Sequence, residues 1–147
     1  MSQVTFYILA ENTAGSSEAA VSQFACQLIA KLYRDKHKVF VFTDTQAQAE
    51  QIDEILWQFD AKQFVAHNLQ GEGPSYGSPV EIGWQAPTNR RSVLVNLSQQ
   101  VPDFSQQFQQ IFDFVPAAEQ PKQQARERYK TFRVAGHVLS TSPAEIA

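Results

Sequence analysis

The chain has 147 residues, of which 43% are hydrophobic and 18% are charged, so a folded globular protein is expected rather than a disordered one. Twelve Lys and Arg residues stand against fifteen Asp and Glu residues, and the net charge of −3 argues against bulk electrostatic binding of DNA or RNA. No apolar run reaches the length of a membrane span, and the total length suits one domain.

Apolar runs and helical stripes alternate along the first part of the chain. Residues 4–9, VTFYIL, predict a buried strand. The turn-forming stretch that follows leads to a helix that Ser16 or Ser17 can cap. One apolar stripe at helical spacing belongs to this helix: Val21, Phe24, Ala25, Leu28, Ile29 and Leu32. Residues 39–42, VFVF, predict a second buried strand.

The rest of the chain adds one helix, several strands and a final helix. Thr43 or Asp44 can cap the next helix. The apolar residues of that helix are Ile52, Ile55, Leu56 and Phe59. Phe64 and Val65 are compatible with a short strand. The remaining expected elements are strands over 79–84, 92–97 and 110–115, a helix over 117–135, and a flexible tail of about ten residues.

The order of these elements predicts an α/β fold. Strands that alternate with amphipathic helices imply a mostly parallel sheet with helices on both faces. The crossovers between parallel strands are expected to be right-handed. We therefore expect a single Rossmann-like three-layer domain over residues 1–147.

A glycine-rich stretch over residues 71–77, GEGPSYG, resembles a dinucleotide-binding fingerprint. Its glycines are spaced G-x-G-x-x-x-G, and a predicted strand follows instead of a helix whose N-terminus could bind pyrophosphate. The chain also lacks the Gly-Lys pair of a P-loop. A long turn is therefore favoured over a phosphate site, and a nucleotide-using enzyme remains an alternative to be tested.

The sequence offers few residues for catalysis or metal binding. Three histidines, His37, His67 and His137, have no short spacing to one another or to Cys26, so no metal site is expected. For His67 a surface or interface position is favoured over the role of a general base. A single cysteine excludes an internal disulfide, and no signal peptide is recognised, so a cytoplasmic protein without a cofactor is expected.

The segment 122–136, KQQARERYKTFRVAG, is basic in an otherwise acidic chain. At about 100° per residue, four of its side chains share one side of a helix, which we call the basic–aromatic face. Its members are Lys122, Arg126, Tyr129 and Arg133. Arg128 and Phe132 lie on another side. An arginine fork beside an aromatic ring suits a carboxylate next to an apolar group, while nucleic-acid phosphate is a competing ligand and a solvated helix face is the alternative without function.

A second group of residues is apolar and aromatic. It contains Trp57, Phe59, Phe64, Val65 and Leu69. Such residues at the end of a helix and in an irregular segment are either ordinary core or anchors for a protein partner. The sequence leaves both interpretations open.

Six segments, spread in order over nearly the whole chain, resemble the chi subunit family of bacterial DNA polymerase III. They are TFYIL at 5–9, IDEILW at 52–57, FVAHNLQGEGP at 64–74, SPVEIGW at 78–84, DFVP at 113–116 and QARERYKTFRVAG at 124–136. The resemblance implies a non-catalytic accessory subunit of the clamp-loader assembly, near the replisome and nucleoid. It also implies a fold similar to nucleotide-binding domains but without the phosphate loop.

The resemblance implies two partners, the psi subunit and the C-terminal tail of single-stranded-DNA-binding protein, and no strong direct binding of nucleic acid or membrane. The implied tail-binding residues are Lys122, Arg126 and Tyr129, with Val115 lining the pocket and Arg128 and Lys130 in support. The implied psi-binding residues are Trp57, Phe59, Phe64, Val65, His67 and Leu69. His137 departs from the aromatic residue expected after Gly136 and could alter the rim of the tail pocket. A module that binds single-stranded nucleic acid directly is the alternative function.

Overall fold

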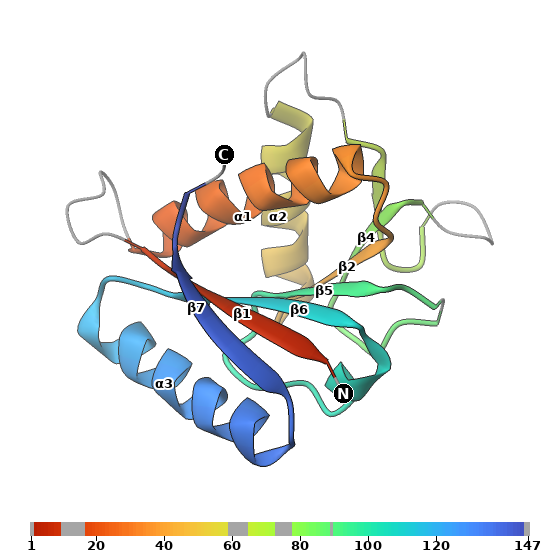
Figure 1. The fold of residues 1–147 in the computed structure, drawn as a ribbon. Coiled ribbons are helices and arrows are strands. Elements are labelled where there is room, and N and C mark those ends of the chain that lie inside the picture. Colours follow the sequence, from red (N-terminus) through yellow and green to blue (C-terminus); the bar gives the residue numbers. More distant parts are fainter. Residues whose placement is uncertain (1, 10–16, 59–64, 73–77, 89, 146–147) are drawn as a thin grey trace.

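A computed structural model shows one β-sheet with helices packed on both of its faces (Figure 1). The structure describes residues 2–9, 17–58, 65–72, 78–88 and 90–145. The elements in chain order are β1 (Gln3–Ile8), α1 (Ser17–Arg34), β2 (Val39–Phe42), α2 (Gln46–Gln58), β3 (His67–Leu69), β4 (Val80–Gly83), β5 (Val93–Asn96), the short 3-10 helix η1 (Ser105–Gln107), β6 (Gln110–Val115), α3 (Glu119–Val134) and β7 (Val138–Pro143).

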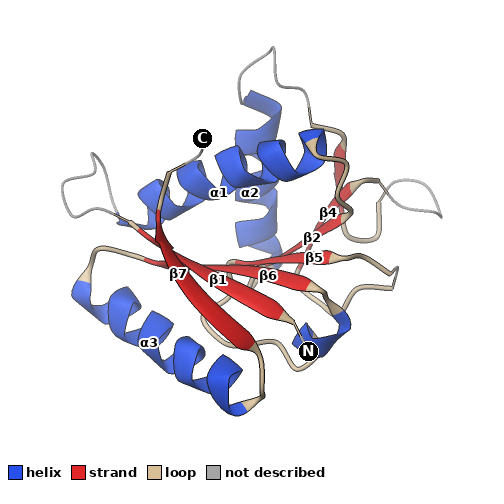
Figure 2. Cartoon of the chain, in the orientation of Figure 1, coloured by secondary structure: helices blue, strands red, loops and turns tan. Residues whose placement is uncertain are grey.

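The seven described strands pair in parallel in the order β3-β4-β2-β5-β6-β1-β7. Helices α1 and α2 lie on one face of the sheet, and α3 lies on the other (Figure 2). The predicted α/β class, with a parallel sheet between helices, is therefore confirmed. Because α2 follows β2 and α3 follows β6, the chain leaves these strands toward opposite faces at their carboxyl ends, where open α/β sheets commonly bind ligands.

Two apolar clusters stabilise the layers. The stripe predicted for the first helix packs into the core on the face of the sheet that α1 and α2 cover, and all of it is buried except Val21, which is half-buried. A second cluster fills the α3 side: Val4, Phe6, Phe40, Leu94, Phe104, Phe108, Ile111 and Phe132. The central strands β2 and β5 contribute to both clusters, which explains why they appear in the sequence as continuous apolar runs rather than alternating patterns.

The structure differs from the sequence prediction in three local details. β3 lies just after Val65 rather than on it, and Phe64 falls outside the described residues. Thr45, not Thr43 or Asp44, caps α2, because its Oγ1 accepts a hydrogen bond from the N–H of Gln48 at 3.2 Å. β7 forms where the sequence suggests a tail. Its residues are mostly exposed Ser, Thr and Pro, so it lacks the apolar signal of the buried strands.

Candidate partner-binding sites

The basic–aromatic face forms along one flank of α3. Three buried side chains mark the side of the helix that packs on the sheet: Ala125, Arg128 and Phe132. Arg126 and Arg133 are exposed, whereas Lys122 and Tyr129 are half-buried. Helical spacing therefore predicted the face correctly, and its exposed cations lie next to an aromatic ring.

Tyr129 joins this face to the core beneath it. Its ring centroid lies 5.4 Å from that of Phe6, which is buried on β1. Val115, at the end of β6, is half-buried and packs against the same cluster. Ile8 pairs in register with Val115 and is 47% exposed. Tyr129 and Val115 thus both pack at the margin of one apolar cluster, and Ile8, in register with Val115, adds an exposed side chain that the sequence placed in the core; we call these three residues the apolar area.

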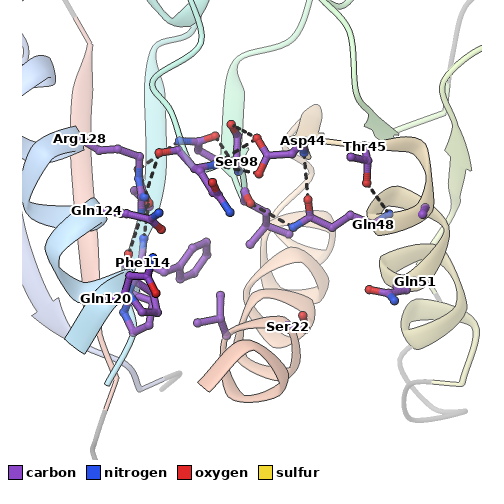
Figure 3. Close-up of a pocket in the computed structure, with 18 residues that line it drawn as sticks. Ser22, Asp44, Thr45, Gln48, Gln51, Ser98, Phe114, Gln120, Gln124 and Arg128 are labelled. Carbon is purple, nitrogen blue, oxygen red and sulfur yellow. Dashed lines mark hydrogen bonds and ion pairs between the residues drawn. The ribbon is translucent and has the colours of Figure 1, made fainter. Parts of the chain in front are cut away.

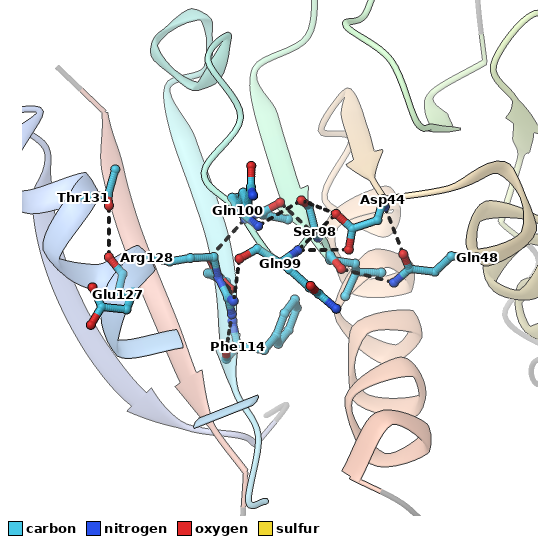
Figure 4. Close-up of polar contacts among 12 residues, drawn as sticks. Asp44, Gln48, Ser98, Gln99, Gln100, Phe114, Glu127, Arg128 and Thr131 are labelled. Carbon is cyan, nitrogen blue, oxygen red and sulfur yellow. Dashed lines mark hydrogen bonds and ion pairs between the residues drawn. The ribbon is translucent and has the colours of Figure 1, made fainter. Parts of the chain in front are cut away.

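Arg128 turns inward, away from the basic–aromatic face. Its Nε–H donates to Oδ2 of Asp113 at 2.9 Å, and an Nη2–H donates to Oδ1 at 3.0 Å. The guanidinium also donates to the backbone carbonyls of Phe114 and Gln99 (Figure 4). Burial raises the pKa of the Asp113 carboxyl, and attraction to Arg128 opposes that shift. These contacts tie α3 to β6 and leave Arg128 buried, while the supporting role in a tail site that the family resemblance implies for it stays a prediction.

Two other residues lie apart from the apolar area. Lys130 is exposed but points about 100° around the helix from Tyr129. His137 is only 8% exposed, its Nδ1 accepts a hydrogen bond from the N–H of Ser2, and its ring meets the edge of Phe132. Because His137 follows the C-terminal end of α3 and Lys122 lies near the other end, the unusual histidine does not form the rim of an apolar site beside Lys122 and Val115.

An exposed tryptophan dominates the opposite part of the sheet. Trp57, in the last turn of α2, is 61% exposed, and its ring centroid lies 4.9 Å from that of His67 on β3. Nδ1 of His67 lies 2.7 Å from the carbonyl oxygen of Val65, and Nε2 lies 3.1 Å from Oδ1 of Asp53. The His67 side chain is itself only 1% exposed. We call Trp57, His67 and Asp53 the Trp57 patch, in which the histidine supports the exposed indole from below.

The other residues of the predicted apolar group divide between core and undescribed segments. Val65 is buried, and Leu69 is half-buried and packs against the core that α1 and α2 cover. Phe59 and Phe64 lie outside the described residues. Asp53, which the sequence gave no role, reaches His67 because β3 folds back beside α2, and no local spacing could have revealed that pair.

Amide side chains hold the start of the glycine-rich stretch. Nδ2 of Asn68 donates to two backbone carbonyls of the same turn at 2.7 and 2.8 Å. The side-chain amide of Gln70 makes four hydrogen bonds with the backbone of residues 84–86. Gly83 leaves room for that amide, since a Cβ there would lie 2.3 Å from Oε1 of Gln70. Gly71 and Glu72, the described start of the glycine-rich stretch, therefore belong to a turn that side-chain amides hold. Residues 73–77 lie outside the described residues, so the long turn predicted over 71–77 stays a prediction.

A cavity of about 610 Å³ lies at the carboxyl ends of β2, β5 and β6 (Figure 3). Oδ1 of Asp44 accepts a hydrogen bond from the Ser98 hydroxyl at 2.8 Å, and Oδ2 accepts one from the N–H of Gln99 at 3.0 Å. Arg128 is the cation among the described lining residues, and it is paired with Asp113. A carboxylate without an unpaired cation beside it does not suit phosphate, so the nucleotide-enzyme alternative gains no support here.

Other candidate chemistry is limited in the part of the chain that the structure describes. There, no group of three or more His, Cys, Asp or Glu residues could hold a metal ion. Cys26 is buried in α1, and burial raises the pKa of its thiol to about 12, which disfavours the nucleophilic thiolate. Within the same residues, no helix combines the length and apolar character needed to cross a membrane.

Comparison with known proteins gives the family. The sequence profile of the family described as "DNA polymerase III chi subunit, HolC" matches residues 1–140. The chain belongs to the DNA polymerase III chi subunit family. The chi subunit of Haemophilus influenzae is 49% identical over 138 residues, which cover 92% of this chain and 93% of that protein. The Escherichia coli K12 chi subunit is 42% identical over 144 residues, covering 97% and 98%, and the Pseudomonas aeruginosa chi subunit is 29% identical over 140 residues, covering 95% and 94%.

Membership of the chi family connects this fold to DNA replication as a polymerase III subunit. The matched residues include all of α3 and the whole Trp57 patch, so both surfaces belong to the family domain. The family resemblance drawn from the sequence segments is therefore confirmed.

Proposed function

We propose that this chi-family chain is a non-catalytic adaptor of the DNA polymerase III clamp-loader assembly. In this proposal it joins the psi subunit to the C-terminal tail of single-stranded-DNA-binding protein during DNA replication. The observation that carries the proposal is the basic–aromatic face, where exposed Arg126 lies one turn from Tyr129 beside an apolar area.

The chemistry of this face suits the end of an acidic peptide. Arg126 offers a planar fork to a terminal carboxylate, which gives a charge-assisted hydrogen bond. Tyr129 and Val115 offer an apolar surface to a terminal aromatic ring, and Lys122 attracts the acidic residues that precede it. Lys130 adds positive charge nearby. Because the cations are largely exposed, the interaction is expected to weaken as salt is added.

The psi subunit is assigned to the Trp57 patch and its surroundings. An exposed tryptophan supported by a buried residue is a typical anchor of a protein interface. Val65 and Leu69 lie beneath this region, and Phe59 and Phe64 join it on the strength of the family resemblance. The patch adjoins β3 while the basic–aromatic face lies near β7, at the other end of the strand order. Two partners could therefore bind at the same time.

Peptide titration tests the tail site directly. A synthetic peptide with acidic residues before a terminal Ile-Pro-Phe is titrated into the wild-type chain and into Arg126→Ala by calorimetry. We expect roughly tenfold weaker binding by the variant, as for loss of a charge-assisted hydrogen bond. The same peptide with an amidated C-terminus is the matched control and should lose a similar part of its affinity. Equal binding in all three experiments would contradict the proposal.

Direct binding of single-stranded nucleic acid is the second candidate, and the same basic–aromatic face favours it. The net charge of −3 weighs against it. A labelled oligonucleotide at low salt separates the candidates. Tight association that Arg126→Ala removes, together with no binding of the acidic peptide, would favour the nucleic-acid function.

A further inference from the structure

β7 ends the sheet and has an outer edge that nothing pairs with among the described residues. Its inner edge binds β1, because the N–H of Val138 donates to the carbonyl of Ser2 and the N–H of Ala144 donates to that of Ile8, both at 3.0 Å. Successive residues of a strand turn their backbone groups to opposite sides. The N–H and C=O groups of Leu139 and Thr141 therefore point outward.

This edge lacks the features that usually prevent edge pairing. Natural edge strands are commonly blocked by charged side chains, by proline or by a bulge. The sequence of β7, VLSTSP, contains no charge, and its proline stands at the last position. Pro143 has no N–H and its carbonyl accepts a hydrogen bond from Glu145, so the open part ends there. Four outward backbone groups on two residues remain available within the described strand.

The cations of α3 lie on the side of this open edge. Arg128 contacts Asp113 on β6, whereas Tyr129 contacts Phe6 on β1, the next strand toward β7. The side of α3 that carries Tyr129 therefore faces β7 more than the side that carries Arg128 does. At about 100° per residue, Arg126 and Arg133 lie further around the helix in the same direction. A strand added to β7 would lie about 4.8 Å beyond it, beneath these side chains.

We propose that the outer edge of β7 binds an acidic, extended peptide segment as an additional strand. The segment exchanges backbone hydrogen bonds with Leu139 and Thr141, and its carboxylates meet Arg133. Lys122 lies on the other side of Arg126 along α3, so it attracts these carboxylates only at longer range. This inference rests on the proposed function, because the segment is the acidic part of the same tail whose terminal carboxylate binds Arg126. Arg126 and Arg133 are separated by about 10 Å of helix, which about three residues of extended peptide can span.

A second copy of this chain is the other obvious occupant of a free edge, and charge argues against it. Two β7 strands related by a two-fold axis would pair antiparallel, with both α3 helices on the same face of the joined sheet. Lys122, Arg126 and Arg133 of each copy would then face those of the other. Like charges at such an interface repel, whereas an acidic peptide neutralises them.

Proline substitution at the edge separates backbone pairing from side-chain contacts. Thr141→Pro removes the outward N–H but no hydrogen bond to β1, and proline is tolerated on an edge strand in that orientation. Thr141→Val keeps the N–H and is the matched control. We expect the acidic peptide to bind Thr141→Pro roughly three- to tenfold more weakly than Thr141→Val, which should bind like wild type. The melting temperature of each variant shows whether the fold is intact.

The other possible results of this experiment each lead to a definite conclusion. If Thr141→Pro and Thr141→Val bind equally while Arg126→Ala loses affinity, the edge is not used and only the inference is wrong. If the wild-type chain does not bind the peptide, the proposed function and the inference both fail. If Thr141→Pro does not fold, peptides methylated at successive backbone nitrogens replace it, and equal binding of all of them would overturn the inference. A wild-type dimer that Thr141→Pro dissociates without affecting peptide binding would assign the edge to a second copy.

Discussion

The two ends of the sheet present different surfaces. Near β7, cations on α3 stand above a shallow apolar area and an open strand edge. Near β3, an exposed indole lies on a buried imidazole. The first surface suits an acidic peptide, and its affinity for that peptide should fall as salt is added. The second surface suits a folded partner that buries apolar area, and its affinity should depend little on salt. Under the proposed function, each end of the sheet therefore binds a different partner through its own chemistry.

The largest expected effect distinguishes two arginines on the same helix. Arg128→Ala leaves the buried Asp113 carboxylate without its cationic partner, so we expect the free energy of unfolding to fall by about 3–5 kcal/mol. Arg126→Ala is the matched control, and its exposed side chain should change stability by less than about 0.5 kcal/mol. Urea unfolding followed by circular dichroism measures both. Similar stabilities of the two variants would show that the inward bonds of Arg128 do not hold α3 in place.

The next effect concerns the β3 end. Trp57→Ala should weaken binding of the psi subunit by about 2 kcal/mol or more, because an exposed aromatic anchor is lost. Its effect on the affinity of the acidic peptide should be negligible. Calorimetric titrations at low and high salt measure the affinities for the psi subunit and for the acidic peptide. Arg126→Ala is the reciprocal control, because it should weaken peptide binding and leave psi binding unchanged. A Trp57→Ala variant that loses peptide binding but retains psi binding would reverse the assignment of the two ends.

A smaller effect tests how the loop beside β3 is shaped. Gly83→Ala places a methyl group where the Gln70 amide lies, so that amide must move and break its backbone hydrogen bonds. We expect a loss of about 1–3 kcal/mol in the free energy of unfolding. In the Gln70→Ala background the second substitution should cost less, because the nearest obstruction is absent and only Cζ of Phe40, 2.9 Å from the added Cβ, remains. Equal costs in both backgrounds would mean that Gln70 does not set the requirement for glycine.

The smallest effect is a pH dependence at the β7 end. Burial lowers the pKa of His137, because the charged imidazolium loses hydration there. The imidazole of His137 therefore binds a proton more readily in the unfolded chain than in the folded one. The free energy of unfolding should fall as the pH drops below about 6.5, the pKa of histidine in the unfolded chain. Unfolding curves at several pH values should show a steeper loss for wild type than for His137→Gln. The same slope in both proteins would contradict this role, since His37 and His67 are common to both.

Much of the fold could be predicted because its signals are local. Buried parallel strands such as β2 are continuous apolar runs, and the residues of the basic–aromatic face follow from helical spacing alone. The inward hydrogen bonds of Arg128 could not be predicted in this way. Helical spacing shows which side of the helix a residue occupies, but it does not show that the Asp113 carboxylate, fifteen residues earlier on β6, lies opposite that side. The contact between Asp53 and His67 likewise depends on how α2 and β3 meet.

β7 escaped prediction for a different reason. A strand at the edge of a sheet buries little apolar area, so its sequence resembles a polar tail. The edge position that removes the apolar signal of β7 also leaves its outer backbone groups available for pairing. Edge strands with small polar side chains are therefore positions at which a structure adds functional information that hydrophobic patterns cannot supply.

Simultaneous binding is the central claim of the adaptor account, and one titration tests it most directly. A fluorescently labelled acidic peptide ending in Ile-Pro-Phe is titrated into the chain alone and into the chain saturated with psi subunit. Binding at opposite ends of the strand order predicts the same dissociation constant, within about twofold, in both experiments. Displacement of the peptide by psi would contradict the account, because it would place both partners on one surface.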